Sequence, residues 1–460
     1  MRFSSGGAGQ IDFSKEEPRK SVARAVVPLL VADILALLYS VVDRIYIGRM
    51  PGQGADALGG IGLCFPFVMM VTAFTNLFGQ GGAPLTAMAR GRSEPQKARE
   101  VMNTAFMLLS ATSLVLLAVF ELFAEPILFA LGGEAAPQLL PHALSYLRLY
   151  LIGTPAAMLA SGLAPYINAQ GYARAGMLVI AIGAVANILL DPLFIFVFGM
   201  GVRGAALATV LSQILSVLFV VSFLRRKNTE LRLSPIPPPR IRPQVVMDIL
   251  GLGVVNFIMQ FTNSLVAVAC NRMLATYGGA VYISVYTVIS SVRQILDVPV
   301  QAIGSGGSPV LSFHYGARRP DRMRETVRLI SLWGIAYTAA VWLLILVAPG
   351  MFIRIFNSDP DLIRTGAPAL RIYFAAFVFQ ALQYSGQTVF RSIRRVRKAI
   401  FFSLLRKVIL VVPLTILLPP FLGASGVFLA EPISNFLGGG ACFLTMMLTE
   451  YRKWGNLTYE

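Results

Sequence analysis

Residues 177–198 read MLVIAIGAVANILLDPLFIFVF, an apolar run long enough to span a bilayer as a helix. Asn187 and Asp191 interrupt it, and their spacing of four places both side chains on one helix face. A carboxylate at the centre of a bilayer costs about 2.5–3.5 kcal/mol on insertion scales, so it usually faces a cavity or a partner. Pro192 lacks a backbone donor and leaves the carbonyl of Ile188 without its intrahelical bond. The run therefore predicts a cation or proton site at membrane depth.

The composition is that of a membrane protein. The chain has 460 residues, of which 56% are hydrophobic and 13% are charged. A soluble protein carries about 25% charged residues, so the deficit predicts an all-α polytopic membrane protein. The net charge is +17, but the basic residues cluster in short connectors between apolar runs. This distribution follows the positive-inside rule and argues against nucleic-acid binding.

Twelve apolar runs are predicted to cross the membrane. Their bounds are about 25–48, 60–88, 101–124, 140–168, 176–198, 201–224, 245–270, 281–311, 326–349, 366–390, 399–422 and 425–449. Alternate connectors and the two termini carry 28 of the 39 basic residues, whereas the other connectors carry five. We therefore expect a multi-pass protein of the cell inner (plasma) membrane with both termini in the cytoplasm.

The sequence repeats itself on either side of a proline-rich segment at residues 234–240. Three short blocks carry the repeat, at offsets of 225, 223 and 222: Gly79, Gly81, Gly82 and Pro84 recur as Gly304, Gly306, Gly307 and Pro309, Arg148-Leu149-Tyr150 recurs as Arg371-Ile372-Tyr373, and Gly204 and Ala208 recur as Gly426 and Ala430. Each half has an even number of spans, so both halves enter the membrane in the same orientation.

The repeat predicts two pseudo-symmetric six-helix lobes around a central cavity, with a substrate site between the lobes and transport by alternating access. The predicted parts are a cytoplasmic segment at 1–24, an N-lobe at 25–227, a cytoplasmic linker at 228–244, a C-lobe at 245–450 and a cytoplasmic tail at 451–460. Two fused lobes predict a working monomer embedded in membrane lipid.

Acids within the spans are the candidates for coupling to a cation. Asp43 shares a helix face with Tyr39, four residues earlier, and could take up and release a proton. Alternatively, Asp43 is a solvated end-cap beside Arg44, and Asp191 makes a structural hydrogen bond. The roles of Asp33, Asp297 and Glu431 stay open.

Thr209 follows the fifth span in a small-residue segment, residues 204–209. Its hydroxyl could bond back to its own helix or face the fifth span.

Motifs for enzyme chemistry are absent from the sequence. It contains no Ser-His-Asp set, no phosphate-binding loop and no metal-ligand cluster. We therefore expect a carrier that is not an enzyme, needs no cofactor or bound metal and is driven by an ion gradient.

Three segments resemble the multidrug and toxic compound extrusion (MATE) family. They are residues 28–48, which end in YSVVDRIYIG; the Asn187-x-x-x-Asp191-Pro192 motif followed by residues 201–209; and residues 304–317, GSGGSPVLSFHYGA. The similarity extends from about residue 25 to residue 450, with the expected two-by-six organisation. The resemblance implies an antiporter that exports organic cations and other drugs in exchange for H⁺ or Na⁺.

The resemblance also implies a cation network in the N-lobe. Its members here would be Asp43, Asn187, Asp191, Thr209 and Tyr146, with Tyr150 as the alternative tyrosine. Some members of the family carry acids in the seventh and tenth spans. This chain has amides in the interior of those spans, which favours the N-lobe site: Asn256, Gln260, Gln380 and Gln383.

Aromatic, methionine and amide side chains are suited to the loose recognition of flat, cationic or amphipathic drugs. The candidates for the substrate cavity are Tyr39, Met158, Met259, Gln260, Tyr286 and Gln383. Ordinary helix packing is the competing interpretation for each of them.

Two other functions compete with drug export. A flippase for lipid-linked precursors or polysaccharides, from the same wider superfamily, would need a cationic central cavity. We expect Arg272 and Arg293 to be the only basic residues near mid-span in the C-lobe. An importer or channel for small metabolites is the third possibility.

Overall fold

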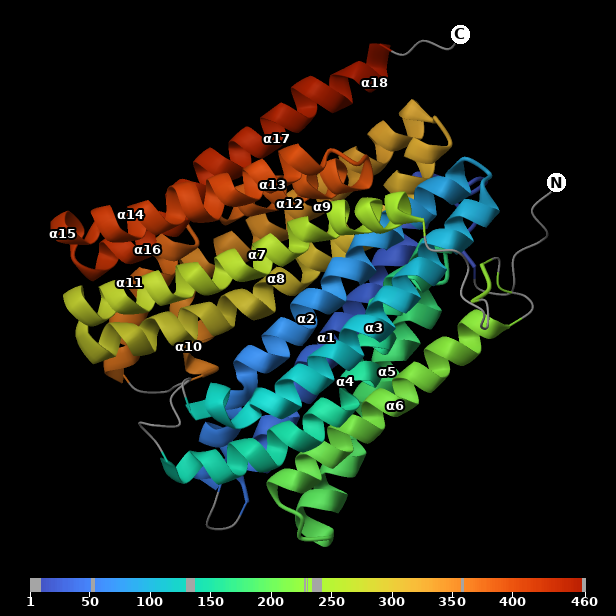
Figure 1. Cartoon of the computed structure of the whole chain (residues 1–460). Helices are drawn as coiled ribbons and strands as arrows, with labels where there is room; N and C mark the ends of the chain where they lie inside the picture. Colours follow the sequence, from blue (N-terminus) through green and yellow to red (C-terminus); the bar gives the residue numbers. More distant parts are fainter. Residues whose placement is uncertain are drawn as a thin grey trace. The chain divides into compact units, whose positions relative to one another are not determined.

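The computed structural model describes residues 10–50, 54–129, 137–226, 229, 231–233, 242–356 and 360–456. Within these residues every regular element is a helix, which confirms the predicted all-α class. Figure 1 labels the helices used below. The proline-rich segment at 234–240 lies outside the described residues.

The first half of the chain forms long helices joined by short turns. They are α1 (Pro18–Gly48), α2 (Gly54–Gly91), α3 (Pro95–Leu128), the short η2 (Pro137–Leu139), α4 (Leu140–Ala169), α5 (Ala173–Pro192), its π-helical continuation η3 (Leu193–Val197) and α6 (Val202–Arg225).

The second half begins in the same way and then becomes more broken. Its elements are α7 (Pro243–Tyr277), α8 (Gly279–Gly316), α9 (Pro320–Val347), α10 (Pro349–Arg354), α11 (Pro360–Tyr373), α12 (Phe377–Ser392), α13 (Val396–Leu404), η4 (Leu405–Val411), α14 (Val412–Leu417), α15 (Pro419–Leu422), α16 (Ala424–Ser434), η5 (Asn435–Gly439), α17 (Gly440–Met446), η6 (Met447–Tyr451) and α18 (Arg452–Asn456).

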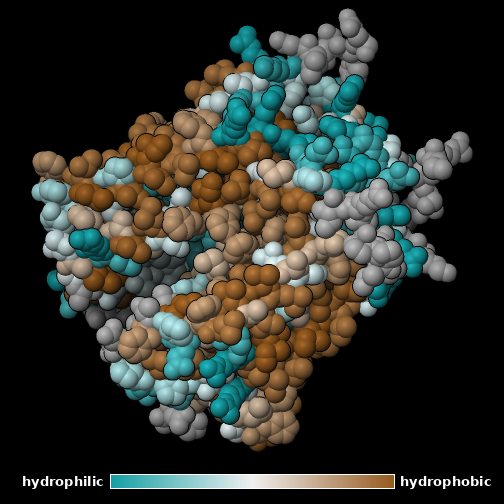
Figure 2. Space-filling model, viewed as in Figure 1, coloured by the Kyte–Doolittle hydropathy of each residue, from teal (hydrophilic) through white to brown (hydrophobic). Residues whose placement is uncertain are grey.

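The described helices have the length and polarity of membrane spans. Ten are long and apolar enough to cross a membrane, and the bent pair α11 and α12 makes an eleventh. Helix α8 is also long, at 38 residues, but carries Arg293 and Asp297 in its interior. Figure 2 shows hydrophobic side chains over much of the visible face of both halves. Many are fully exposed to the surroundings, such as Leu122 at 76% and Leu189 at 66%, as expected for lipid-facing residues.

The chain divides into two compact units. The first unit comprises residues 10–12 and Val27–Val254, and the second comprises Phe13–Val26 and Val255 onward. Glycines explain the unit boundaries. A Cβ at Gly81 of α2 would lie 2.3 Å from the Ile249 carbonyl oxygen of α7, and one at Gly306 of α8 would lie 2.8 Å from the Val26 nitrogen of α1. The start of α7 thus packs in the first unit and the start of α1 in the second. The predicted lobe division at 228–244 stays a prediction.

The repeat is visible in the local structure of the turns. Ser93 and Arg318, 225 residues apart, both have positive φ angles, 59° and 53°. Gly171 and Arg394 form a second pair, 223 residues apart, and Gly201 and Gly423 a third, 222 residues apart. The hydrogen bonds recur too: the Glu94 nitrogen donates to Ala89 and the Arg319 nitrogen to His314. The offsets predicted from the sequence are those that relate the left-handed turns.

Helix neighbours within each unit follow the same pattern. In the first unit α2 packs on α3 and α4, α3 on α4, and α5 on α6. In the second unit α8 packs on α9, α11 and α12, α9 on α12, and α14 on α16. The first unit thus has α4 at its centre, and the second has the pair α11 and α12 there.

Three features depart from the predicted spans. The span at 366–390 is two helices, α11 and α12, bent by 45° at residues 374–376. The spans at 399–422 and 425–449 contain the π-helical segments η4, η5 and η6. The fifth span ends in η3, directly after Asp191-Pro192. Such π segments interrupt regular helix hydrogen bonding and are frequent at functional sites.

Candidate functional site: a buried acid pair in the first unit

Helix α5 carries the polar stretch Asn187–Asp191 into the interior of the first unit. Asn187 is 1% exposed and Asp191 is fully buried. Their spacing of one helical turn brings the side chains together, and the Asn187 Nδ2 donates to Asp191 Oδ1 over 3.2 Å. Pro192 ends the α-helix, and the chain continues as the π-helical η3. Asp191 therefore sits where the regular backbone bonding of the span is interrupted.

Helix α6 is positioned against this stretch by two glycines. Gly201 has a φ of 59° in the turn between η3 and α6. A Cβ at Gly204 would lie 2.7 Å from the backbone carbonyl of Phe194, so α6 packs on η3 with no room for a side chain there. This close packing places Thr209 opposite Asn187.

Thr209 makes both of the interactions considered from the sequence. Its Oγ1 donates to the Ala205 carbonyl over 3.0 Å, one turn back along α6. The same oxygen accepts a hydrogen bond from Asn187 Nδ2 at 3.4 Å. Asn187 thus bridges Thr209 and Asp191, which joins α5 to α6 through polar side chains.

Helix α1 contributes the second acid. The side chains of Asp43 and Asp191 lie within hydrogen-bonding contact of each other. Asp43 Oδ1 and Asp191 Oδ2 are buried, and no donor from the described residues reaches either oxygen. The Asn187 Oδ1 is likewise buried with no donor among those residues. The end-cap interpretation of Asp43 is therefore incomplete, because one of its oxygens faces another carboxylate inside the unit.

Tyrosines of α1 and α4 surround the acid pair. Tyr146 is 6% exposed and interacts electrostatically with Asp43 and Tyr39. Tyr150 stacks on Tyr146 with ring centroids 5.8 Å apart, and its hydroxyl contacts Gln213 of α6. The structure brings both tyrosines to the site, with Tyr146 the one that interacts with Asp43. Gln213 was missed because no spacing rule links α6 to α4.

This arrangement suits a small hard cation or a proton. Two carboxylates in contact repel each other when both are ionised, so they share a proton or require a positive charge between them. Their free oxygens, together with the Asn187 carbonyl oxygen, are the hard ligands that H⁺ and Na⁺ prefer. The site can therefore bind and release a monovalent cation, and the use of these residues for coupling stays a prediction.

The residues predicted to line the substrate cavity lie in both units. Met158 of α4 is fully buried, and Tyr286 of α8 packs on Phe428 with centroids 6.5 Å apart. Gln383 of α12 donates to the Phe402 carbonyl over 3.4 Å. Three more of these residues, which are half-buried, are Tyr39, Met259 and Gln260. Their contact with substrate stays a prediction.

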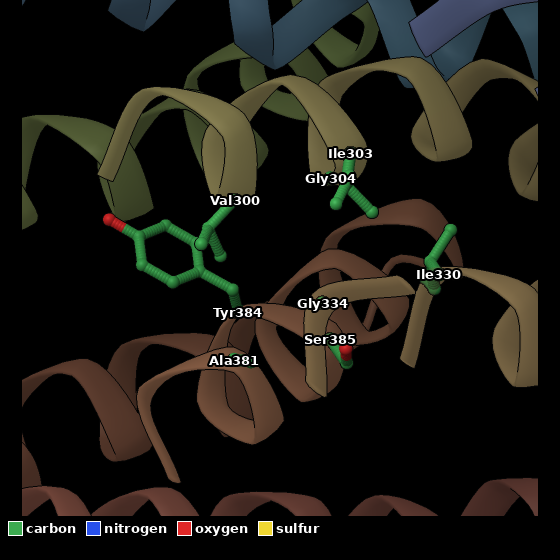
Figure 3. A pocket seen from close by; sticks show the side chains of 8 residues that line it. All are labelled: Val300, Ile303, Gly304, Ile330, Gly334, Ala381, Tyr384 and Ser385. Carbon is green, nitrogen blue, oxygen red and sulfur yellow. The ribbon is translucent and has the colours of Figure 1, made fainter. Parts of the chain in front are cut away.

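A small pocket lies within the second unit, between α8, α9 and α12 (Figure 3). Gly304 and Gly334 leave the space, and Figure 3 shows the Tyr384 ring beside Val300 at one end of it. Among the described residues that line this pocket, none is a predicted substrate contact.

The expectation that Arg272 and Arg293 are the only mid-span bases of the second half was wrong. Arg406 and Lys407 are 6% and 7% exposed within η4, inside the predicted eleventh span. Arg272 is exposed, whereas Arg293 pairs with Glu431 at 2.6 Å. The signal was present in the sequence, since Arg406-Lys407 interrupts an apolar run rather than a connector.

Comparison with known proteins identifies the family. The MatE family model matches residues 28–193 and 256–417. The multidrug export protein MepA of Staphylococcus haemolyticus is 22% identical over 429 residues, which cover 92% of this chain and 93% of the relative. MepA of Staphylococcus aureus strain MSSA476 is 21% identical over 449 residues, 97% of each chain.

The fold is shared with solved transporters. An outward-facing multidrug resistance MATE family transporter of the MOP superfamily has a TM-score of 0.89 at 22% identity, covering 99% of this chain and 100% of the other. A MOP superfamily transporter from Pyrococcus furiosus has a TM-score of 0.87 at 22% identity, covering 98% and 100%. The family match, the two-unit helical fold and the polar network of α1, α5 and α6 agree, and the chain therefore belongs to the MATE family of membrane transporters.

Proposed function

We propose that this protein is a secondary antiporter that exports organic cations and amphipathic drugs in exchange for protons. The observation that carries the proposal is the contact between the Asp43 and Asp191 carboxylates, whose inner oxygens have no donor among the described residues. Relatives along nearly the whole chain are named multidrug export proteins. Na⁺ is the alternative coupling ion, because the same oxygens are ligands for either cation.

The proposed cycle uses the repulsion between the two acids. When both are ionised, the pair is unstable away from water, and uptake of one proton removes the repulsion. Asn187 and Thr209 hold Asp191 in place through the 3.2 and 3.4 Å hydrogen bonds, so a change in its charge acts directly on the α5 and α6 pair. The membrane potential adds about 2.3 kcal/mol per charge per 100 mV.

The proposed setting follows the positive-inside pattern. Both termini face the cytoplasm of a cell whose inner (plasma) membrane holds the protein as a monomer. The substrate enters from the cytoplasm or the inner leaflet and leaves on the other side as a proton passes inward.

Resistance in a drug-sensitive host tests this function. A strain lacking its own efflux pumps is given the wild-type gene, Asp43→Asn, Asp191→Asn or Asp33→Asn, and its growth is measured in ethidium. We expect the wild type to raise the tolerated ethidium concentration, and the first two variants to lose that gain at equal protein level. Asp33→Asn is the matched control, because Asp33 is a half-buried acid of α1 outside the pair. Full resistance with both Asp43→Asn and Asp191→Asn would eliminate the proposed site.

The alternative is a flippase of the same wider superfamily, and one observation favours it. Three bases, Arg293, Arg406 and Lys407, are buried in the second unit. Their contacts with Glu431 neutralise most of that charge, which makes drug export the better interpretation. A flippase would leave ethidium tolerance unchanged in the same growth assay.

A further inference from the structure

The second unit contains a buried cluster of five charged residues that the acid-pair mechanism does not use. We call it the second-unit ionic cluster: Arg293 and Asp297 of α8, Arg406 and Lys407 of η4, and Glu431 of α16. The side chains are between 4% and 15% exposed. Charges so far from water persist when they are paired and hydrogen-bonded.

Glu431 is the centre of the cluster. Its Oε1 lies 2.6 Å from a terminal nitrogen of Arg293, 3.2 Å from one of Arg406 and 3.4 Å from Lys407 Nζ. An oxygen that accepts from three cationic donors belongs to an ionised carboxylate. Glu431 therefore supplies one negative charge.

Asp297 is held in the same state. Its Oδ2 accepts from Arg293 Nε at 3.4 Å, and its Oδ1 accepts from Gln380 Nε2 at 2.6 Å. Both oxygens are acceptors, so Asp297 supplies the second negative charge. The Tyr373 hydroxyl accepts from Arg293 at 2.6 Å and stays neutral, since a phenol in water ionises near pH 10.

The cluster then has one base too many. Three bases face two acids, and the described residues place no third acid in contact with the cluster. Arginine does not lose its proton in proteins, whereas a buried lysine does so readily. Lys407 is also the most weakly held of the three bases, because its one ion pair is the longest contact to Glu431. Charge balance therefore falls on Lys407.

The surroundings of Lys407 leave it no other counter-charge. The titratable groups that face it are Arg293 and Asp297 from α8, Tyr373 from α11, Glu431 from α16 and Cys270 from α7, with Arg406 beside it. Cys270 contacts Thr415 of α14 at 4.0 Å. The neighbouring Arg406 is fixed by Asn435 of η5 at 2.5 Å, while its Nε is buried with no acceptor among the described residues. Any acceptor that arrives would be competing with this unused arginine donor.

We propose that Lys407 is a second proton-exchange site of the transporter, in the second unit. It is neutral while the cluster is closed from water, and its Nζ lone pair binds a proton from water when the cluster opens; the same proton returns to water on closing. Two Arg–carboxylate pairs hold the cluster in shape while the lysine changes charge. The role in transport rests on the proposed function, but the exchange of a proton at Lys407 does not.

Difference titration of the purified protein without substrate tests the exchange itself. Proton uptake between pH 6 and 9 is measured for the wild type, Lys407→Met and Lys407→Arg. We expect both variants to take up about one proton fewer per molecule than the wild type. Lys398→Met is the matched control: Lys398 is half-buried, pairs with Glu450 at 2.7 Å and should show no difference, because an ordinary lysine stays protonated below pH 9.

Two results overturn the proposal. One is identical proton uptake by the wild type and Lys407→Arg, which retains the charge if Lys407→Met does not fold. The other is a wild-type difference that appears when chloride is present and vanishes when it is replaced by gluconate, which would make the cluster an anion site.

Transport gives the functional test. In vesicles with an internal acid load, ethidium transport by Lys407→Met should change by less than twofold between pH 6 and 8, where the wild type changes about tenfold. Lys407→Arg should be at least tenfold slower than the wild type at every pH. A wild-type pH profile in both variants contradicts a role in transport. Loss of ethidium transport in the wild type, with the titration difference intact, would contradict the proposed function alone.

Discussion

Asn187 is the residue through which Thr209 acts on the acid pair. Its amide nitrogen reaches Asp191 at 3.2 Å and Thr209 at 3.4 Å, all inside the first unit. Replacing Thr209 by Val keeps the shape of the side chain and removes the acceptor, and a buried donor left unpaired costs about 1–3 kcal/mol. We expect Thr209→Val to lower the thermal unfolding temperature and to reduce ethidium resistance about tenfold. Thr209→Ser keeps the hydroxyl and should restore both. Equal losses in the two variants would show that the methyl group, not the hydroxyl, matters.

Prediction at this scale succeeded where the residues are neighbours on one helix. The spacing of Asn187 and Asp191 predicted their contact, and the 3.2 Å bond confirms that they share a face. The meeting of Asp43 with Asp191 joins residues 148 positions apart, and no local pattern carries that information. It came from the family resemblance. Arg406 and Lys407 were overlooked because basic residues were assigned to connectors, although a buried ion pair permits them within a span.

At the scale of elements, the close packing of α6 on η3 depends on Gly204. Its Cβ would lie 2.7 Å from the Phe194 carbonyl carbon and oxygen, which are backbone atoms that cannot rotate away. We expect Gly204→Ala to separate the two elements at a cost of about 1–3 kcal/mol. Thermal unfolding followed by tryptophan fluorescence measures this loss. Gly62→Ala of α2 is the matched control, since no heavy atom of the described residues lies within 4 Å of its Cβ, and it should be neutral or slightly stabilising. An unfolding temperature for Gly204→Ala at or above that of the wild type contradicts this packing argument.

Helix positions followed from hydrophobic run length, but helix irregularities did not. Long apolar runs gave α1 to α9 with bounds within a few residues. The break between α11 and α12 falls at Phe374–Ala376, where no proline or glycine marks it. The π segments η4 and η5 lie beside Pro413 and Pro432, but a proline in a span also occurs in ordinary kinked helices. Tertiary packing decides between these outcomes.

At the scale of the whole molecule, two related units carry opposite electrostatics. The turns at Ser93 and Arg318 and the glycines of α2 and α8 follow one repeat. The first unit buries a pair of acids with no base in contact, and the second buries three bases on two acids. The shared backbone was predictable from the offsets between glycines. The difference in charge could not be, because it depends on which side chains the packing brings together.

The central claim is that the acid pair of the first unit exchanges a proton for the drug. Its most direct measurement is the proton flux that ethidium drives across vesicles containing the purified protein, without sodium and with the membrane potential clamped. We predict that the wild type and Asp33→Asn move protons opposite to ethidium, and that the double variant Asp43→Asn with Asp191→Asn moves none. Proton flux of wild-type size in the double variant would contradict the account.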